Sequence, residues 1–245
     1  MLISVLLALS LNLRSGVRWF WMSLPLAAIG TVFFAAGLDG ITDALDGAGQ
    51  EVANATLQGL VYCFTVAIVW ISAAAVDVPM RANLFRTLMA SAVVCAMIRE
   101  GSEIFVYIAG FTAAEEHRAA VFAGSVLGAG IGLSLGVLLF SLLRAMETGL
   151  ANKSCLILIS LIGAGMVMQS TMLLEQVDWL PSGAPLWDSS GLISEQSIAG
   201  ELLYAVFGYE STPGAVQAML YAASLLLSFA AYAAATYKGR PVHAQ

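Results

Sequence analysis

Residues Thr87–Gly110 read TLMASAVVCAMIREGSEIFVYIAG, an apolar stretch interrupted in its middle by the pentapeptide Arg-Glu-Gly-Ser-Glu at 99–103. A charged side chain at the centre of a bilayer costs at least ~2.5–3.5 kcal/mol, so charges within a transmembrane helix are usually functional. The cost of these charges has to be offset by a partner or a ligand. We therefore expect the functional site of the protein at this pentapeptide.

The composition indicates a membrane protein. The chain has 245 residues, of which 60% are hydrophobic and 11% are charged, and its mean hydropathy is +0.87. Soluble domains have roughly 25% charged residues. Apolar runs of about 20 residues, the length that crosses a bilayer as a helix, recur along the chain. These features predict an all-α, polytopic protein in a lipid bilayer, and the net charge of −6 gives no indication of a nucleic-acid partner.

Seven apolar segments are predicted to cross the membrane. The gaps between them contain Arg, Asp, Asn, Pro and Gly, which are typical of turns and membrane interfaces. Cys63, Cys95 and Cys155 fall within the segments at wide spacing, which argues against a disulfide framework or a zinc site. The segments are Leu2–Leu13, Val17–Leu38, Val52–Val76, Thr87–Gly110, Ala119–Leu143, Cys155–Leu174 and Ala215–Tyr237.

The distribution of charges predicts how the segments are oriented. Eight of the ten Lys and Arg residues fall on alternate connections: Arg14, Arg18, Arg81, Arg86, Arg144, Lys153, Lys238 and Arg240. Twelve of the sixteen acidic residues fall on the other connections: Asp39, Asp43, Asp46, Glu51, Glu115, Glu116, Glu175, Asp178, Asp188, Glu195, Glu201 and Glu210. By the positive-inside rule, we expect a cytoplasmic C-terminus and, with seven crossings, an external N-terminus.

The first segment is too short to span a bilayer. As a helix, Leu2–Leu13 is about 18 Å long, against ~30 Å of hydrocarbon. It has neither the basic start nor the cleavage site of a signal peptide. Met1 is followed by about a dozen apolar residues, then a charged loop, then an apolar helix. Glu103 in the second half of the chain is followed by the same three elements in the same order. The chain thus begins where its second half carries the pentapeptide.

This correspondence predicts an inverted repeat within a single transmembrane domain, residues 1–245. The first repeat is 1–76, which is N-terminally incomplete, and the second is 87–174. An outer loop, 175–214, and a last helix, 215–237, follow. Three-helix repeats of opposite direction are common in transporters, whose sites lie near the midplane between the repeats.

Glycines mark one face of the fifth segment. Gly124, Gly128, Gly132 and Gly136 recur every four residues, with Gly130 between them. Small residues at this spacing allow another helix backbone to approach closely. We interpret them as a sign of tight packing in a compact bundle, without a chemical role.

The pentapeptide carries two carboxylates that can face the same way. Glu100 and Glu103 are about 60° apart around a helix axis, so both are predicted to face one cavity. Arg99 can form an ion pair with Glu103, and Gly101 leaves space for a ligand or a neighbouring helix. Carboxylate oxygens suit hard cations. The alternative is a buried salt bridge that locks helices together, although one carboxylate would then stay uncompensated.

These residues resemble the ferric iron permease family, the high-affinity iron transporters of fungi and bacteria. The family signature, Arg-Glu-Gly-x-Glu, normally occurs twice, and residues 99–103 match the second copy. Ser197-Ile198-Ala199-Gly200, Phe207-Gly208-Tyr209 and Pro213 resemble the segment before the family's last helix.

The resemblance implies that Glu100 and Glu103 bind iron, that Arg99 orients them and moderates their charge, and that Gly101 supports the site. Ferric iron would be the transported substrate, with no permanently bound cofactor. A multicopper oxidase or a periplasmic iron-handling protein would be the partner.

The chain departs from the family pattern in two places. The first signature copy is absent, and Met1 aligns just after it. We expect that an N-terminal piece is missing, because the remaining segment is too short to span; the alternative is a divergent member with half a site. The DNA upstream of Met1 would distinguish the two. In addition, Gln58-Gly59 stands where similar proteins often carry an acidic residue before the glycine.

Two acidic clusters on the predicted outer side are weaker candidates. They are Glu115, Glu116 and His117 in one loop, and Asp39, Asp43, Asp46 and Glu51 in another. The first cluster could collect cations for the site, but for both we prefer the interpretation as a solvated face. No Ser-His-Asp, phosphate-loop or His-Glu-x-x-His pattern occurs, so an enzyme has little support.

The sequence therefore predicts a permease of the cell membrane that moves ferric iron inward through a carboxylate-lined path. Two other functions stay open. One is a transporter of another metal cation or a proton-coupled carrier that uses Glu100 or Glu103. The other is a transport-inactive membrane subunit of the same fold.

Overall fold

The computed structural model describes residues 1–74, 79–112 and 117–238, except for the side chains of residues 79–81 and 238. Within these residues the chain is helical, and its one β contact is an isolated bridge between Pro185 and Gly214. The helices are α1 (Leu2–Asn12), α2 (Arg18–Ala44), α3 (Gly49–Ala73), α4 (Pro79–Thr112), α5 (Arg118–Ala145), α6 (Thr148–Gln176), α7 (Ile198–Phe207) and α8 (Ala215–Lys238).

The long helices have the length and composition of membrane spans. Among the described residues, five helices are long and apolar enough to cross a bilayer, namely α2, α3, α5, α6 and α8. The longest helix, α4, has 34 residues and carries the charged pentapeptide. Large apolar side chains such as Val126 and Leu133 on α5 are 71% exposed, as expected for a surface that faces lipid. The prediction of an all-α, multi-pass membrane protein is confirmed.

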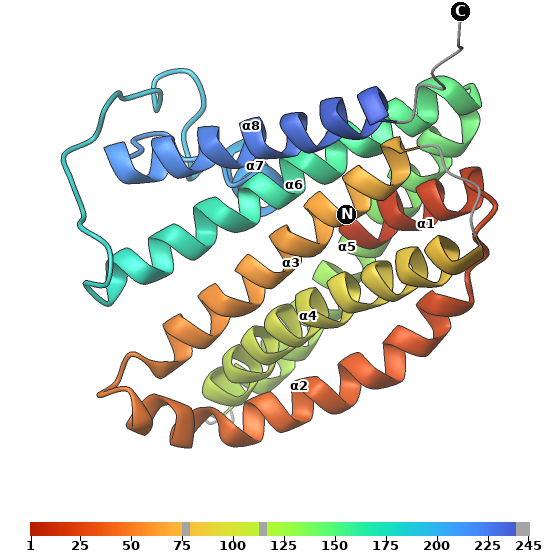
Figure 1. Ribbon diagram of the computed structural model, residues 1–245. Helices are drawn as coiled ribbons and strands as arrows, with labels where there is room; N and C mark the ends of the chain where they lie inside the picture. The colour runs from red at the N-terminus through yellow and green to blue at the C-terminus, as the bar shows by residue number, and fades with distance from the viewer. Residues whose placement is uncertain (75–78, 113–116, 239–245) are drawn as a thin grey trace, which may run out of the picture.

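The helices run up and down through one bundle, which separates the connections into two sets (Figure 1). The α1–α2 and α5–α6 connections lie at one end, with Arg14 and Arg144. The α2–α3 connection and the long segment between α6 and α8 lie at the other end, with Asp43 and Asp46. Basic and acidic residues thus gather at opposite ends of the bundle. Of the charges used to predict orientation, Glu115, Glu116, Arg240 and the side chains of Arg81 and Lys238 lie outside the described residues.

Helix packing follows the pattern of two inverted three-helix units. The second helix of each unit packs along the first helix of the other: α2 contacts α4, and α5 contacts α1. The third helices behave in the same way, because α3 contacts α4 and α6 contacts α1. The two third helices, α3 and α6, also pack extensively against each other, and α8 covers both of them. The contacts of α1, α2 and α3 with the second half of the chain thus mirror those of α4, α5 and α6 with the first half.

The short first helix is a core element. α1 has 11 residues, about 17 Å of helix, and its N-terminus lies midway along the bundle (Figure 1). Val5, Leu6 and Leu9 are fully buried. At its other end, the guanidinium of Arg144 donates to Oδ1 of Asn12. Burial of both faces explains why so short a helix is held in place.

The glycine face of α5 is not used as predicted. Cβ atoms added at Gly124, Gly128, Gly130 or Gly132 would meet no other described segment within 4 Å. Gly136 alone approaches a neighbour, the hydroxyl of Ser4 in α1, at 3.0 Å from its Cβ position. The expectation of tight packing along this whole face is wrong within the described chain, because α1 covers only one end of α5.

The predicted outer loop contains a helix, α7. The hydroxyl of Ser197 caps it by accepting from the N–H of Gly200 at 3.0 Å. It ends at Gly208, whose φ of +67° lies in the left-handed region. A Cβ at Gly208 would lie 2.8 Å from the Cα of Gly165 in α6. Two glycines thus allow the end of α7 to rest directly on α6, and this contact fixes one wall of the candidate site.

Candidate functional site

A polar cavity of about 280 Å³ lies between α3, α4, α6 and α7. It contains part of the charged pentapeptide, and its other polar side chains come from helices of both repeats and from the outer segment. The lining residues are Gln50, Glu51, Asn54, Arg99, Glu103, Tyr107, Gln169, Met172, Leu173, Gln176 and Tyr204.

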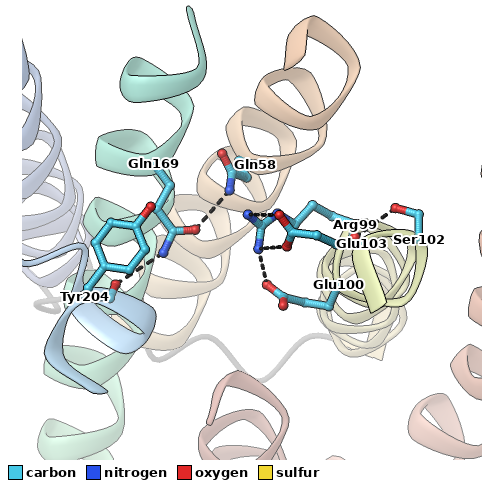
Figure 2. Close-up of polar contacts among 7 residues, drawn as sticks. All are labelled: Gln58, Arg99, Glu100, Ser102, Glu103, Gln169 and Tyr204. Carbon is cyan, nitrogen blue, oxygen red and sulfur yellow. Dashed lines mark hydrogen bonds and ion pairs between the residues drawn. The ribbon is translucent and has the colours of Figure 1, made fainter. Parts of the chain in front are cut away.

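Arg99 holds the two glutamates of the motif, and it lies between them (Figure 2). Its Nη1 atom is 2.6 Å from Oε1 of Glu100 and 3.1 Å from Oε2 of Glu103. The Arg99 side chain is 14% exposed, that of Glu103 is 34% exposed and that of Glu100 is 54% exposed. All these ion pairs lie within α4, so the triplet does not lock different helices together, as the alternative interpretation required.

The two carboxylates do not line the same cavity. Glu103 lines the polar cavity, whereas Glu100 does not. Glu100 instead lies near the amino group of Met1, with which it interacts electrostatically. Both side chains project from the same side of α4 (Figure 2), but of the two only Glu103 lines this cavity.

Gly101 permits the close approach of a neighbouring helix. A Cβ at this position would lie 2.9 Å from both Cγ2 and Oγ1 of Thr31 in α2. The Thr31 hydroxyl also donates to the carbonyl oxygen of Met97 at 3.3 Å. Of the two roles predicted for Gly101, the structure supports space for a helix. This contact sets the rotation of α4, and with it the direction of the glutamates.

A chain of amide hydrogen bonds joins α7, α6 and α3 beside the cavity (Figure 2). Nε2 of Gln169 donates to the carbonyl oxygen of Tyr204 at 3.2 Å. Oε1 of Gln169 accepts from Nε2 of Gln58 at 3.0 Å. Because the Tyr204 carbonyl can only accept, it sets the orientation of Gln169, which in turn sets that of Gln58. The oxygen of Gln58 is left without a hydrogen-bond partner.

Three oxygen atoms on α3 are buried without a hydrogen-bond partner. They are Oε2 of Glu51, Oδ1 of Asn54 and Oε1 of Gln58. Glu51 was predicted to belong to a solvated acidic face; this is wrong, because its side chain turns into the cavity. The prediction holds for Asp39, Asp43 and Asp46, which are exposed. The spacing i, i+3, i+7 of the three polar residues in an otherwise apolar segment was the sequence signal for this face.

Of the three residues predicted as a possible cation-collecting cluster, only His117 is described, and it does not line the cavity. Glu115 and Glu116 lie outside the described residues, and His117 is exposed at the start of α5. Among the residues that the structure describes, no group of three or more His, Cys, Asp or Glu side chains could hold a metal ion. Cys63, Cys95 and Cys155 are free thiols, in agreement with the prediction.

A second group of ionisable residues lies in the segment between α6 and α8, which was predicted to be an outer loop and is called the outer segment below. Oε1 of Glu195 accepts from the backbone N–H of Ser211 at 2.6 Å, and hydrogen bonding to Ser211 lowers the pKa of this carboxyl. Burial raises the pKa of Glu210 to about 7, and the hydrogen bond and charge of Glu195 add to the rise. Glu210 lines a cavity of about 450 Å³ together with Trp187. The pair therefore retains one proton near neutral pH.

Comparisons of the chain with protein-family models, with curated proteins and with solved structures give no match. The resemblance to iron permeases thus rests on the motif residues alone.

Proposed function

We propose that the protein is a cation permease of the iron-permease type, which moves ferric iron across the cell membrane. The observation that carries the proposal is a carboxylate pair within a long helix of a membrane bundle, with one member, Glu103, on a polar cavity. Such residues are expensive to keep in a membrane and typically mark the path of an ion or a substrate. Glu100 and Glu103 are the proposed ligands, and Arg99 orients them.

The ion pairs suggest the order in which the ligands exchange. The bond of Arg99 to Glu100 is 2.6 Å long, whereas its contacts with Glu103 are 3.1 and 3.5 Å. Glu103 is thus held more weakly, and it faces the cavity from which a cation would arrive. An arriving cation competes with Arg99 for Glu103 first, and recruits Glu100 only when Arg99 moves aside.

The chemistry of the cavity favours a hard cation. Its acidic side chains are Glu51 and Glu103, and its other polar groups are amides, phenols and one guanidinium. Carboxylate and amide oxygens prefer hard cations, whereas soft metals prefer thiolates. Two carboxylates do not neutralise a trivalent ion, so transport of iron requires further negative charge or bound hydroxide.

We place the acidic end of the bundle outside and the basic end, with the C-terminus, in the cytoplasm. Cations would then arrive at the acidic end. A multicopper oxidase or a periplasmic iron-handling protein is the proposed partner that delivers ferric iron there.

Uptake of radioactive ferric iron tests the proposal in bacterial cells that lack their own high-affinity uptake. We expect the rate of iron uptake to fall at least about tenfold in the double variant Glu100→Ala/Glu103→Ala. The reason is that interactions of ionised carboxylates are among the strongest in a binding site. The matched control is Glu201→Gln, an exposed carboxylate on α7. Equal uptake by the double variant and the native chain, at equal membrane abundance, would show that the ligand assignment is wrong.

Transport of a different cation is the second candidate, and one observation favours it. Arg99 balances one of the two carboxylates of the motif, which leaves a charge that suits a divalent ion or a proton better than a trivalent ion. Competition by manganese, ferrous and zinc ions in the uptake assay separates these cases, and acidification of vesicle interiors detects a proton-coupled carrier. A chain that moves no cation in any assay would be the transport-inactive subunit.

A further inference from the structure

We propose that Glu51 and Asn54, on the polar face of α3 that also includes Gln58, form a cation-binding site in the cavity that Glu103 lines. The site takes a hard cation that keeps part of its hydration shell. The inference deepens the proposed function, on which it rests for the direction of transport but not for binding. The motif resemblance assigns no role to Glu51 or Asn54.

The three residues share one side of the helix and one chemical property. They are separated by three and four positions, which places them in a row along α3. Asn54 is 5% exposed and Gln58 is 1% exposed. Each of the three has a buried oxygen atom without a hydrogen-bond partner. An unsatisfied buried acceptor costs about 1–3 kcal/mol, so the cost of three such acceptors in a row favours a ligand that binds them.

The oxygen of Gln58 is held in place as an acceptor. Its amide nitrogen is committed to Gln169, which is committed to the carbonyl oxygen of Tyr204. Rotation of the Gln58 amide by 180° would break this chain and bring two oxygens together. The fold therefore presents an oxygen on α3 and prevents the donor side of the amide from taking its place.

A cation fits this row better than a protein donor does. The terminal nitrogens of Arg99 already bind Glu100 and Glu103, and its Nε atom makes no hydrogen bond to the oxygens of α3. A hard cation accepts six or more oxygens, which can include carboxylate and amide oxygens as well as water. The cavity of about 280 Å³ is many times the ~15 Å³ that one water needs, so an ion enters with part of its hydration shell.

The carboxylates on facing helices complete the site. Glu51 on α3 and Glu103 on α4 both line the cavity. Carboxylates supply the charge, and amide oxygens supply neutral ligands, which is the mixture that hard cations select. The α3 face thus receives the ion before it reaches Glu100, which lies outside the cavity.

Binding of Tb³⁺ to the purified protein in nanodiscs tests the site directly. Tb³⁺ is a hard, oxygen-seeking ion, and Tyr107 and Tyr204 in the cavity wall sensitise its luminescence. We expect Glu51→Gln to weaken Tb³⁺ binding about tenfold or more, since ligand charge sets affinity in such sites. Asn54→Asp adds a charge and should strengthen binding several-fold. The matched control is Asp43→Asn, an exposed acidic residue at the same end of the bundle, which should leave binding unchanged.

The outcomes distinguish this site from the proposed function. If Glu103→Gln weakens Tb³⁺ binding while Glu51→Gln and Asn54→Asp leave it unchanged, the α3 site is refuted and the motif assignment stands. If Glu51→Gln weakens binding but the double glutamate variant of the motif transports iron normally, the proposed function fails and the α3 site stands. Binding that responds equally to Asp43→Asn would refute the α3 site, because the ion would then occupy the surface. As a folding control, each variant should elute as a single species in size-exclusion chromatography and unfold at the same temperature as the native chain. A change in Tb³⁺ binding then does not result from misfolding.

Discussion

Breaking the amide chain between α3, α6 and α7 gives a prediction whose size follows from the structure. Gln58→Leu removes one interhelical hydrogen bond of 3.0 Å. Gln169→Leu removes that bond and a second one of 3.2 Å to the carbonyl of Tyr204. Both glutamines are at least 95% buried, since Gln58 is 1% and Gln169 is 5% exposed. We expect the free energy of unfolding to fall by about 1–2 kcal/mol for Gln58→Leu and by about 2–3 kcal/mol for Gln169→Leu.

The double variant measures how far the two residues act together. Interhelical hydrogen bonds in one membrane protein average about 0.6 kcal/mol and reach about 1.7 kcal/mol. Because Gln58 and Gln169 are deeply buried, we expect a coupling energy near the upper value. Gln58→Leu/Gln169→Leu should therefore be less destabilised than the sum of the single variants, because replacing both partners by apolar groups leaves fewer unsatisfied atoms.

The assay is reversible unfolding in mixed micelles with increasing dodecyl sulfate, followed by circular dichroism. Thr56→Val is the control, because Thr56 is exposed on α3 and its change should stay within about 0.5 kcal/mol. If the effects of Gln58→Leu and Gln169→Leu add to within about 0.5 kcal/mol, they do not interact. The orientation of the Gln58 oxygen would then have no structural basis.

Three further changes test the packing and the outer segment. Gly101→Ala should destabilise the protein by about 1–3 kcal/mol, because its Cβ meets Thr31, and Thr31→Ala should restore most of the loss in a thermal unfolding assay. Gly208→Ala combines a left-handed backbone with a clash, so we expect a loss of at least about 1–2 kcal/mol by the same assay; a neutral effect would contradict the close contact of α7 with α6. The Glu210 carboxyl has a pKa raised to about 7 from 4.5, so the folded state binds the extra proton and the stability of the outer segment should fall as pH rises from 4.5 through 7. The fluorescence of Trp187 is obtained by subtracting the signal of Trp187→Phe from that of the native chain. It should change with the titration of Glu210 in the native chain and no longer change in Glu210→Gln. A fluorescence midpoint near pH 4.5 in the native chain would refute the raised pKa.

Hydropathy was sufficient to find the long helices, because lipid requires about 20 apolar residues of any helix that crosses it. The predicted segments Ala119–Leu143 and Ala215–Tyr237 coincide with α5 and α8 to within a few residues. The same criterion missed α7, because ten residues are too few to register as a span. Its cap and its terminal glycine were local signals that hydropathy does not use.

The site was only partly predictable. The ion pairs of Arg99 with Glu100 and Glu103 follow from spacing along one helix, because such contacts depend on local geometry alone. Glu51 was assigned to a solvated cluster with Asp43 and its neighbours, since the loop charges look alike in the sequence. Only the burial of α3 against α4 and α6 separates Glu51 from the others.

The sequence by itself determined that the protein is an all-α membrane bundle, that its charges divide between two ends, and that a pair of carboxylates lies within the fourth apolar segment. The tertiary structure decided which carboxylates share a cavity. The periodicity of a helix fixes the angle between two of its own side chains, but it does not fix the rotation of that helix against its neighbours. That rotation depends on close contacts between distant residues, such as Gly101 with Thr31 and Gly208 with Gly165. These contacts turn Glu103 toward Glu51 and leave Glu100 outside.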